Sequence, residues 1–408
     1  MDTTRQEGMI WLGIAALYIL ALITDNGLLL VMAVLLTLVV GTVMLWGRFA
    51  LERVEYHRSF GRTHCFAGEE VELTVELTNR KLLPLSYLTV DDSVPESLEL
   101  RAQKVLFHRK GRSVLRLLFS LAWYQKVVRH YKVRATRRGF YRLGPGTIKG
   151  GDPFGWVDDA IPIDESDLLL VYPNTMPLEQ VGLPSRRPFG DLKSNDKLFE
   201  DPMRFAGVRE YQQGDPLNRI HWKASAASGR LQVRQLDPSA SLGLAIFLNT
   251  WSFDHFWEGD DVSALEAGCT LAASVVKWAT EEGLAVGLYA NGLIYQWGMS
   301  LRLPPARGEQ VLQHTLEGLA RLQSGSPQPI DELIATEMQT LPYGTTVVVI
   351  TRQVGDDLAA QIMRVHRSGR PVTLIVTAPE PQALPYLPGV RIYEVGGEEG
   401  LHAAVLAR

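Results

Sequence analysis

The chain has 408 residues and a formal net charge of −4, so its overall charge gives no general attraction for nucleic acid. This length allows about two or three domains with buried cores. The two cysteines, Cys65 and Cys269, lie far apart and have no neighbouring Cys or His, so neither a disulfide framework nor a zinc site is expected.

An apolar stretch runs from Met9 to Trp46 and is broken only by the turn sequence Thr24-Asp25-Asn26-Gly27. One helix over this stretch would be about 57 Å long, far more than the roughly 30 Å of hydrocarbon in a bilayer. We therefore expect a membrane anchor over residues 1–55, with transmembrane helices at about 9–23 and 27–46. A cleaved signal peptide is disfavoured because no small-x-small cleavage site follows the first apolar segment.

Arginines flank the expected helical hairpin. Arg5 precedes it, and the turn between the helices contains no basic residue; the arginines that come after it are Arg48, Arg53, Arg58 and Arg62. Because basic segments stay inside, both termini and the soluble domains are expected on the cytoplasmic side of the membrane.

The next expected domain spans residues 56–180, and from about residue 56 to residue 156 its sequence changes to a period of two. Glu70–Leu77 alternates strictly between acidic or polar and apolar residues, and Tyr131–Ala135 alternates in the same way. Glycine and proline interrupt these runs at short spacings. The pattern predicts an antiparallel β-sandwich or a barrel-like domain of about a hundred residues, and we favour the sandwich.

Basic residues are concentrated in the second half of this β-domain. The candidates for a lipid-facing surface are Arg129, Lys132, Arg134, Arg137 and Arg138. Such a surface beside an anchor would bind anionic lipid, with about 1 kcal/mol from each cation. The simpler and preferred interpretation is cross-strand pairing with the acidic strand at Glu70–Glu76. Nucleic-acid binding is a weaker third alternative, because stacking aromatics are not interleaved with these cations.

Residues 181–240 contain a polar, proline-containing linker and a dense motif segment, and residues 241–408 alternate between strands and helices. A hairpin is expected at Asn291-Gly292, between runs 284–290 and 293–297. The other expected strands are 242–248, 346–351 and 372–376, and the expected helices are 263–282, 308–323 and 356–368. The near-continuous apolar strands predict a doubly wound, mainly parallel sheet. The chain as a whole is thus an α+β multidomain protein.

P-loop, G-x-S-x-G and H-E-x-x-H motifs are absent from the sequence. The densest polar segment runs from Tyr211 to Leu231 and contains Gly214, Asp215, Arg219, Trp222 and Ser225. Asp215 can accept backbone N–H bonds and cap the next structural element. Arg219 offers a planar fork for carboxylates or carbonyls, and Trp222 offers a large apolar anchor.

Three interpretations of this segment stay open. The preferred one is a structural joint between the two soluble domains, with Arg219 and Trp222 internally satisfied. The second is a surface that docks a partner protein. A hydrolase would pair Ser225 with His221 and recruit Asp215, but nothing in the sequence builds an oxyanion hole, so we expect no catalytic residue.

At this segment the chain resembles the domain-of-unknown-function family fifty-eight. The matching residues are Gly214, Asp215, Arg219, Ile220, Trp222, Ser225 and Ala226, together with the stretches 138–141, 152–155 and 171–173. Ala227 departs from the pattern, since many relatives carry a basic residue there. The resemblance implies a bacterial inner-membrane protein that accompanies a MoxR-type AAA+ ATPase, and a C-terminal half similar to the von Willebrand factor type A fold.

That fold often holds a divalent metal at the end of its first strand, through Asp-x-Ser-x-Ser and residues of other loops. Here Asn249 replaces the aspartate, Trp251 and Phe253 replace the serines, and Arg352 follows Thr351 where an aspartate is usual. An arginine at this position would repel a metal cation. We therefore expect a degenerate site that binds no metal, and we expect no cofactor. Asp356 and Asp357 are expected in the first turn of the next helix.

The function predicted from these observations is that of a non-enzymatic membrane adaptor or scaffold. Its expected partners are membrane lipid and a MoxR-type ATPase, in envelope-related or complex-assembly processes. A metal-dependent ligand-binding module is the first alternative and requires Asn249 and Arg352 to converge on one face. The hydrolase with Ser225 and His221 is the second.

Overall fold

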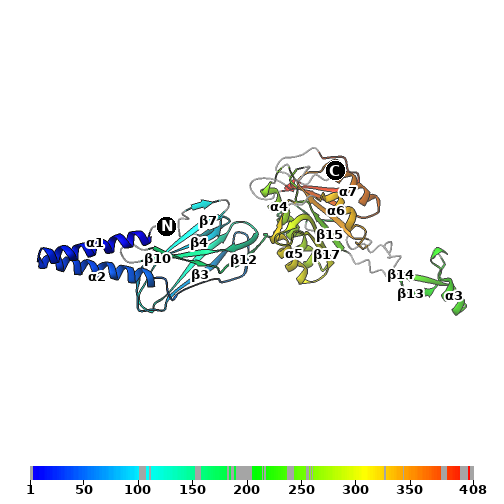
Figure 1. Cartoon of the computed structure of the whole chain (residues 1–408). Coiled ribbons are helices and arrows are strands. Elements are labelled where there is room, and N and C mark those ends of the chain that lie inside the picture. Colours follow the sequence, from blue (N-terminus) through cyan, green and yellow to red (C-terminus); the bar gives the residue numbers. More distant parts are fainter. Residues whose placement is uncertain are drawn as a thin grey trace. The chain divides into compact units, whose positions relative to one another are not determined.

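The computed structural model of the chain divides into two compact units. Unit 1 comprises residues 1–136 and 141–169, and unit 2 comprises residues 137–140 and 170–408. The residues that the structure describes are 3–100, 107–109, 112–151, 158–181, 183–184, 188–189, 205–213, 215, 217–236, 243–253, 257, 259, 261–325, 328–342, 344–377, 384–395 and 403–404. Each unit is described by itself (Figure 1).

Unit 1 begins with two apolar helices, α1 (Thr3–Ile23) and α2 (Gly27–Phe49). Asn26 caps α2, because its side chain accepts the N–H of Leu28. The helices pack on each other, and the Tyr18 hydroxyl lies 3.2 Å from the Thr37 hydroxyl. Among the described helices, α2 is long and apolar enough to cross a membrane, whereas the apolar part of α1 is a shorter stretch, 8–23.

Antiparallel sheets form the remainder of unit 1. The strands are β1 (Val54–Phe60), β2 (His64–Phe66), β3 (Glu70–Asn79), β4 (Leu85–Pro95), β5 (Leu98–Leu100), β6 (Phe107–Arg109), β7 (Arg112–Leu121), β8 (Lys126–Ala135), β9 (Gly139–Leu143), β10 (Gly146–Gly151), β11 (Asp158–Ile163) and β12 (Asp167–Tyr172). Among these described strands, the sheets have the orders β1-β3-β8-β5, β11-β10-β4-β7-β6 and β2-β12-β9. The chain passes from one unit to the other within β9 and β12.

The predicted alternation is present in these strands. Val71, Leu73, Val75 and Leu77 of β3 are buried, while the residues between them are half-buried or exposed. The inward residues of β7 and β8 are buried in the same alternating way, whereas β4 also buries Leu88, Thr89 and Val90 in succession. These faces form the core of a sandwich-like arrangement of sheets.

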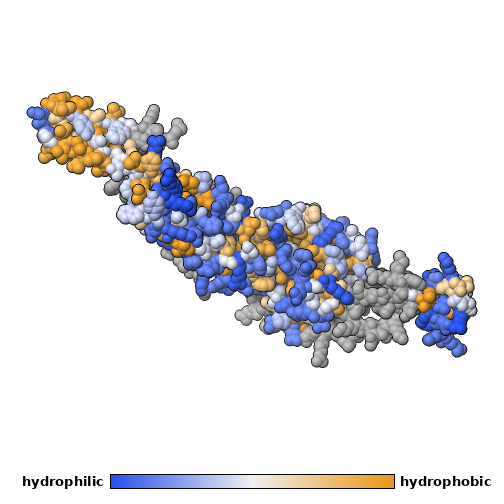
Figure 2. All heavy atoms as spheres, turned by 90° about the horizontal axis from the view of Figure 1, so that it is seen from below, coloured by the Kyte–Doolittle hydropathy of each residue, from blue (hydrophilic) through white to orange (hydrophobic). Residues whose placement is uncertain are grey.

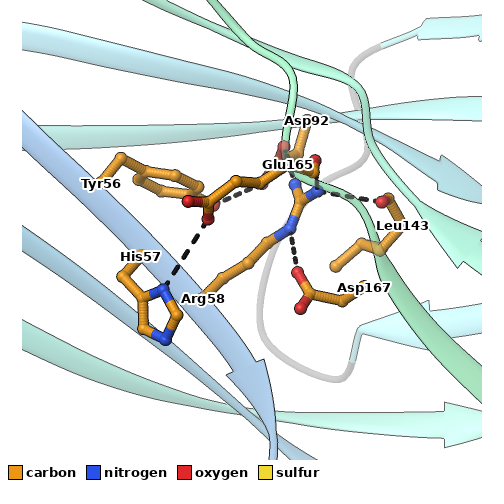
Figure 3. A network of polar contacts seen from close by, with 7 residues as sticks. All are labelled: Tyr56, His57, Arg58, Asp92, Leu143, Glu165 and Asp167. Atoms are coloured by element: carbon orange, nitrogen blue, oxygen red, sulfur yellow. Dashed lines mark hydrogen bonds and ion pairs between the residues drawn. The ribbon is translucent and has the colours of Figure 1, made fainter.

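One inward-facing position of β1 carries a charge. The side chain of Arg58 is 0 % exposed. Its Nε donates to Asp167 at 2.6 Å, one terminal nitrogen donates to Asp92, and the other donates to the carbonyls of Leu143 at 2.9 Å and Glu165 at 2.6 Å (Figure 3). A single guanidinium thereby ties β1 to β4, β9, β12 and the turn before β12.

A small β13–β14 module, residues 205–236, comes next in unit 2. It consists of strand β13 (Phe205–Glu210), a 3₁₀ turn (Leu217–Arg219), helix α3 (Trp222–Ser228) and strand β14 (Gln232–Leu236). The two strands pair antiparallel. Among the module's described side chains whose exposure is defined, Ile220 and Val233 are the buried ones, and an isolated bridge joins them.

The rest of unit 2 is a mainly parallel sheet with helices on both faces. Its strands are β15 (Gly243–Leu248), β16 (Ala285–Ile294), β17 (Ser300–Ala306), β18 (Leu322–Gln323), β19 (Thr346–Thr351), β20 (Val372–Val376), β21 (Arg391–Val395) and β22 (Ala403–Ala404). Its helices are α4 (Val262–Glu281), α5 (Glu309–Arg321), α6 (Ile330–Glu337) and α7 (Asp356–Arg367). The described strands follow the order β17-β16-β15-β19-β20-β21-β22, and β18 pairs with β16.

Strands β16, β15, β19, β20 and β21 run parallel, and β17 and β22 run antiparallel to their neighbours. Alternate residues of β15 face opposite helix layers: Phe247 packs with α6 and α7, whereas Leu248 contacts α4 at Gly268. Figure 1 shows α4 and α5 on one side of the sheet and α6 and α7 on the other. The predicted β-α alternation is therefore present.

The predicted hairpin at Asn291-Gly292 is wrong. Both residues lie inside the continuous strand β16, and Asn291 is 0 % exposed. The pairing of β16 with β17 shifts register between Ala290 and Leu293, so the two residues form a bulge. A Cβ on Gly292 would lie 2.5 Å from the carbonyl oxygen of Gln323, which explains the glycine.

Candidate functional site

The turn of the β13–β14 module is held by a bidentate ion pair. Arg209 of β13 donates to both carboxylate oxygens of Asp215, at 2.7 and 2.6 Å, and the Gln212 N–H donates to Asp215 at 2.8 Å. This planar fork fixes the carboxylate in one orientation. Asp215 therefore secures the turn that leads out of β13.

His221 and Ser225 attach α3 to β14. His221 is the N-cap of α3, because its Nδ1 accepts the N–H of Ala224 at 3.1 Å; the cap is thus His221 and not Asp215. The Ser225 hydroxyl accepts the N–H of Gln232 at 2.8 Å and donates to the His221 carbonyl at 3.1 Å. Both side chains that the hydrolase alternative needs are engaged with backbone groups of the module.

Trp222 is exposed, contrary to the expectation of a buried joint. It is the first residue of α3, and 68 % of its surface is accessible. Leu217, Leu231 and Val208 of the same module are also exposed. Arg219 lies in the 3₁₀ turn, but its side chain and Gly214 are outside the described residues. The module therefore combines a polar network that fixes its shape with an apolar surface that faces solvent.

A second candidate site lies at the carboxyl edge of the parallel sheet. Asn249 follows β15, and Thr351 and Arg352 stand at the end of β19, so all three border one cavity of about 10 Å³. The two strands flank the point where the strand order reverses, the place at which open α/β sheets commonly bind ligands. The convergence of Asn249 and Arg352 that the metal-binding alternative requires is present.

The residues at this edge do not fit a divalent cation. Asn249 Oδ1 already accepts the N–H of Trp251 at 3.1 Å, and Asn249 Nδ2 donates to the Thr351 hydroxyl at 3.1 Å. The guanidinium of Arg352 lies 3.0 Å from Asp261 and 5.1 Å from the centre of the Phe253 ring. Among the described residues, no group of three or more His, Cys, Asp or Glu side chains could hold a metal ion. The positively charged guanidinium of Arg352, rather than a set of open oxygen ligands, lies at this edge.

Asn291 organises this edge and was missed by sequence analysis. Its Oδ1 accepts the N–H and the hydroxyl of Thr250 at 2.7 and 3.1 Å, and its Nδ2 donates to Asn249 at 2.9 Å and to the Gln328 carbonyl at 3.3 Å. The sequence signal for this role is that apolar residues continue on both sides of Asn291-Gly292, which is typical of one uninterrupted strand. The amide thereby holds the loop after β15 against β16.

The five basic candidates for a lipid-facing surface do not form one group. Arg134 lies opposite Glu70 and Lys132 lies opposite Glu72 in the β3–β8 ladder. Neighbouring positions form ion pairs, with Lys126 at 2.7 Å from Glu76 and His130 at 3.0 Å from Glu72. The register therefore agrees with the predicted cross-strand pairing.

Arg129 and Arg138 have other contacts. Arg129 lies 4.2 Å above the Phe119 ring and donates to the Leu118 carbonyl at 2.8 Å. Arg138 is buried and belongs to unit 2; it donates to the carbonyls of Leu319 and Leu322 at 2.5 and 2.9 Å and lies 3.3 Å from Glu266. Burial raises the pKa of Glu266, although the charge of Arg138 opposes this. The expectation that Arg138 faces lipid is wrong, and Arg137 also lies in unit 2.

Residues 207–404, which include the parallel sheet and all but the first two residues of the β13–β14 module, match the model of the family described as "Protein of unknown function DUF58". This part of the chain belongs to the DUF58 family. The predicted family resemblance is confirmed. A DUF58-related protein of Bacillus subtilis (strain 168), "Uncharacterized protein YeaD", is 25 % identical over 313 residues, which cover 76 % of this chain and 73 % of the relative.

Solved structures give weaker likenesses to this chain. The CARDB domain of the PF1109 protein from Pyrococcus furiosus is 14 % identical, with a TM-score of 0.20, over 29 % of this chain and 91 % of that domain. A cohesin module from Clostridium perfringens is 11 % identical, with a TM-score of 0.22, over 28 % of this chain and 96 % of the module. Scores at this level carry no argument about fold or function.

Proposed function

We propose that this DUF58 protein is a non-enzymatic membrane adaptor whose β13–β14 module docks a partner protein. The observation that carries the proposal is the exposure of Trp222 on a module whose turn and helix are held by paired polar groups. The proposed partner is a MoxR-type AAA+ ATPase, as the family resemblance implies, in envelope-related or complex-assembly processes.

Two properties of the module support docking. An isolated pair of strands is marginally stable in water and gains from a covering surface. The Arg209–Asp215 pair and the His221 cap give the module a fixed shape, so little side-chain entropy of these groups is lost when a partner binds. Tryptophan on such a rigid support is the residue type that most often dominates the energy of an interface.

The anchoring part of the proposal includes both N-terminal helices. At 1.5 Å per residue, α2 is roughly 35 Å long, enough for the hydrocarbon core. The apolar stretch 8–23 of α1 is roughly 24 Å long, a short span that local thinning of the bilayer accommodates. Their outward faces are strongly apolar, as Figure 2 shows for the blue helices of Figure 1, and include exposed Leu12, Leu22 and Ile23 of α1 and Leu35 and Leu38 of α2. A water-soluble protein rarely exposes so large an apolar surface.

The proposed topology places both termini in the cytoplasm. Arg58 is neutralised by Asp92 and Asp167. Arg48 in the last turn of α2, and Arg53 and Arg62 beyond it, are exposed. In intact cells, a C-terminal tag should therefore resist external protease and become cleavable only after the membrane is opened. Cleavage of the tag in intact cells would place the soluble units outside and reject the topology.

We also propose that the parallel sheet is of the von Willebrand factor type A kind, without its metal. The order β17-β16-β15-β19-β20-β21 corresponds to 3-2-1-4-5-6 in order of appearance, and its edge strand β17 is reversed. Where the strand order reverses, the side chain of Asn249 is held in hydrogen bonds and the guanidinium of Arg352 lies in the place of free metal-binding oxygens.

Capture from solution tests the adaptor function. Full-length protein in neutral detergent, immobilised through a C-terminal tag, should retain a purified MoxR-type ATPase from the same organism in the presence of nucleotide. Retention should persist after washing at moderate salt, because an apolar anchor is not screened by ions. Failure of the intact protein to retain the ATPase under every nucleotide condition would reject this partner.

A further inference from the structure

A groove opens in unit 1 where α2 ends. It has a volume of about 360 Å³. Its apolar wall includes Leu45 and Phe49 of α2 and Leu82 of the loop between β3 and β4, and its charged residues are Arg53, Lys81 and Glu52. The apolar wall thus continues the surface of the helix that crosses the membrane, and cations border its other side.

Lys81 is built into this groove. The residue is 9 % exposed, and its ammonium group donates to the carbonyls of Ala50 and, at 2.6 Å, of Glu52 at the end of α2. An ammonium group has three donors, and the described residues provide acceptors for two of them. Burial lowers the pKa of Lys81 to about 8, although Glu52 opposes the shift. A nearby anion would raise this pKa again and stabilise the charged form.

Arg53 supplies a second cation. It is exposed, and its backbone adopts φ of 54°, a conformation that non-glycine residues rarely take. This geometry turns the chain immediately after α2. Neighbouring Arg80 is already paired with Glu55 at 2.8 Å, which leaves Arg53 and Lys81 as the cations that face the groove.

The loops beside the groove display residues typical of a membrane interface. Leu82 is 71 % exposed, and the turn between β7 and β8 exposes 66 % of Trp123 and 65 % of Tyr124. The Tyr124 N–H donates to the Lys81 carbonyl at 3.1 Å, so this turn lies directly beside the β3–β4 loop. Tryptophan and tyrosine concentrate at the level of lipid headgroups.

We propose that this groove binds one anionic phospholipid of the membrane that holds α2. The lipid phosphate accepts hydrogen bonds from Lys81 and Arg53, and an acyl chain lies along Leu45 and Phe49. Leu82, Trp123 and Tyr124 enter the headgroup layer beside it. The proposal rests on the membrane insertion of α2 proposed above, and it adds a specific lipid to the anchor.

Delipidated full-length protein in neutral detergent provides the test. Titration with phosphatidylglycerol, followed by native mass spectrometry, should show one tightly retained lipid, whereas phosphatidylcholine should bind at least about tenfold more weakly. Arg53→Gln and Lys81→Gln should each raise the Kd for phosphatidylglycerol about tenfold, the effect of losing one charge-assisted bond. The control Arg62→Gln removes an exposed arginine outside the groove and should bind as the parent does.

Lys81 also holds the end of α2, so Lys81→Gln can lower stability by itself, whereas Arg53→Gln changes an exposed side chain. Equal retention of phosphatidylglycerol by the parent and Arg53→Gln would overturn the proposal, and so would equal retention of phosphatidylcholine. Displacement of the lipid by millimolar inorganic phosphate would assign the site to free phosphate instead. Release of the protein from membranes by alkaline carbonate would refute the membrane anchor independently of these measurements.

Discussion

Arg58→Met is expected to lower the free energy of unfolding of unit 1 by about 3–5 kcal/mol, the usual cost of removing one partner of a buried ion pair. The methionine fills much of the same space but leaves the carboxylate of Asp92, whose side chain is 1 % exposed, without its buried cation. Burial lowers the pKa of Arg58, but the charge of Asp92 and the bond to Asp167 outweigh it and raise the pKa above the ordinary value. The arginine therefore stays charged at all ordinary pH values.

The two cysteines allow this effect to be measured in each unit separately. Cys65 lies in unit 1 and Cys269 in unit 2, both buried, and burial raises the pKa of each thiol to about 11. When opening is fast and reversible, the rate of thiol labelling follows the open population. A loss of about 3 kcal/mol should accelerate labelling of Cys65 more than about a hundredfold, while Cys269 should keep its parental rate.

Matched variants define the results that would contradict this prediction. Arg62→Met removes an exposed arginine four residues away and should leave both labelling rates unchanged. Adding Asp92→Asn and Asp167→Asn to Arg58→Met removes the unpaired charges and should recover part of the lost stability. Parental labelling of Cys65 in Arg58→Met would mean that the network shown in Figure 3 contributes little to folding.

Trp222→Ala is expected to weaken capture of the MoxR-type ATPase about thirtyfold or more, which corresponds to about 2 kcal/mol for a central interface residue. The exposed side chain should contribute little to folding, so melting of the protein should be unchanged. Binding is measured with immobilised full-length protein in neutral detergent, and melting is measured on the same samples.

Trp257→Ala is the matched control, because Trp257 is also 68 % exposed and lies outside the β13–β14 module. It should retain parental binding. A lower melting temperature for Trp222→Ala together with lost binding would support the structural joint instead of a docking surface. Ser225→Ala tests the hydrolase alternative. The substitution removes the hydrogen bond that the Ser225 hydroxyl accepts from the Gln232 N–H, so it should loosen α3. It should abolish no activity, because we expect Ser225 not to act as a nucleophile.

Local periodicity was sufficient to predict the parallel sheet. The runs at 346–351 and 372–376 coincide with β19 and β20, and the expected helix at 356–368 differs from α7 by one residue. Asp356 and Asp357 occupy the first turn of α7 as expected. The strands are almost uniformly apolar and the helix is strongly amphipathic, so neighbouring residues determine these elements.

Features that depend on distant contacts were not predictable in the same way. Asn291-Gly292 has the composition of a hairpin turn, but the Asn291 amide finds partners from residues about forty positions away. The topology prediction includes Arg58 among the positive charges near the membrane. The alternation of β1 instead places its side chain in the interior of unit 1, on the same face of the strand as Tyr56. Burial of Trp222 is the expectation from residue type, because tryptophan is highly buried on average. The sequence does not show whether another element packs over α3, and the side chain is exposed.

The buried Asn291 also has a chemical consequence. A glycine after asparagine leaves the following backbone nitrogen unhindered. In an unfolded Asn-Gly sequence this nitrogen attacks the side-chain amide carbon and expels ammonia, and water then opens the resulting succinimide to aspartate or isoaspartate. In the folded protein, the extended strand and the four hydrogen bonds of the amide hold the reacting atoms apart. An aspartate formed while the chain is open would bring a negative charge into a site with no room for its hydration. Unfolding that lasts long enough for cyclisation would therefore change this site irreversibly, so the native fold protects the Asn291 amide chemically.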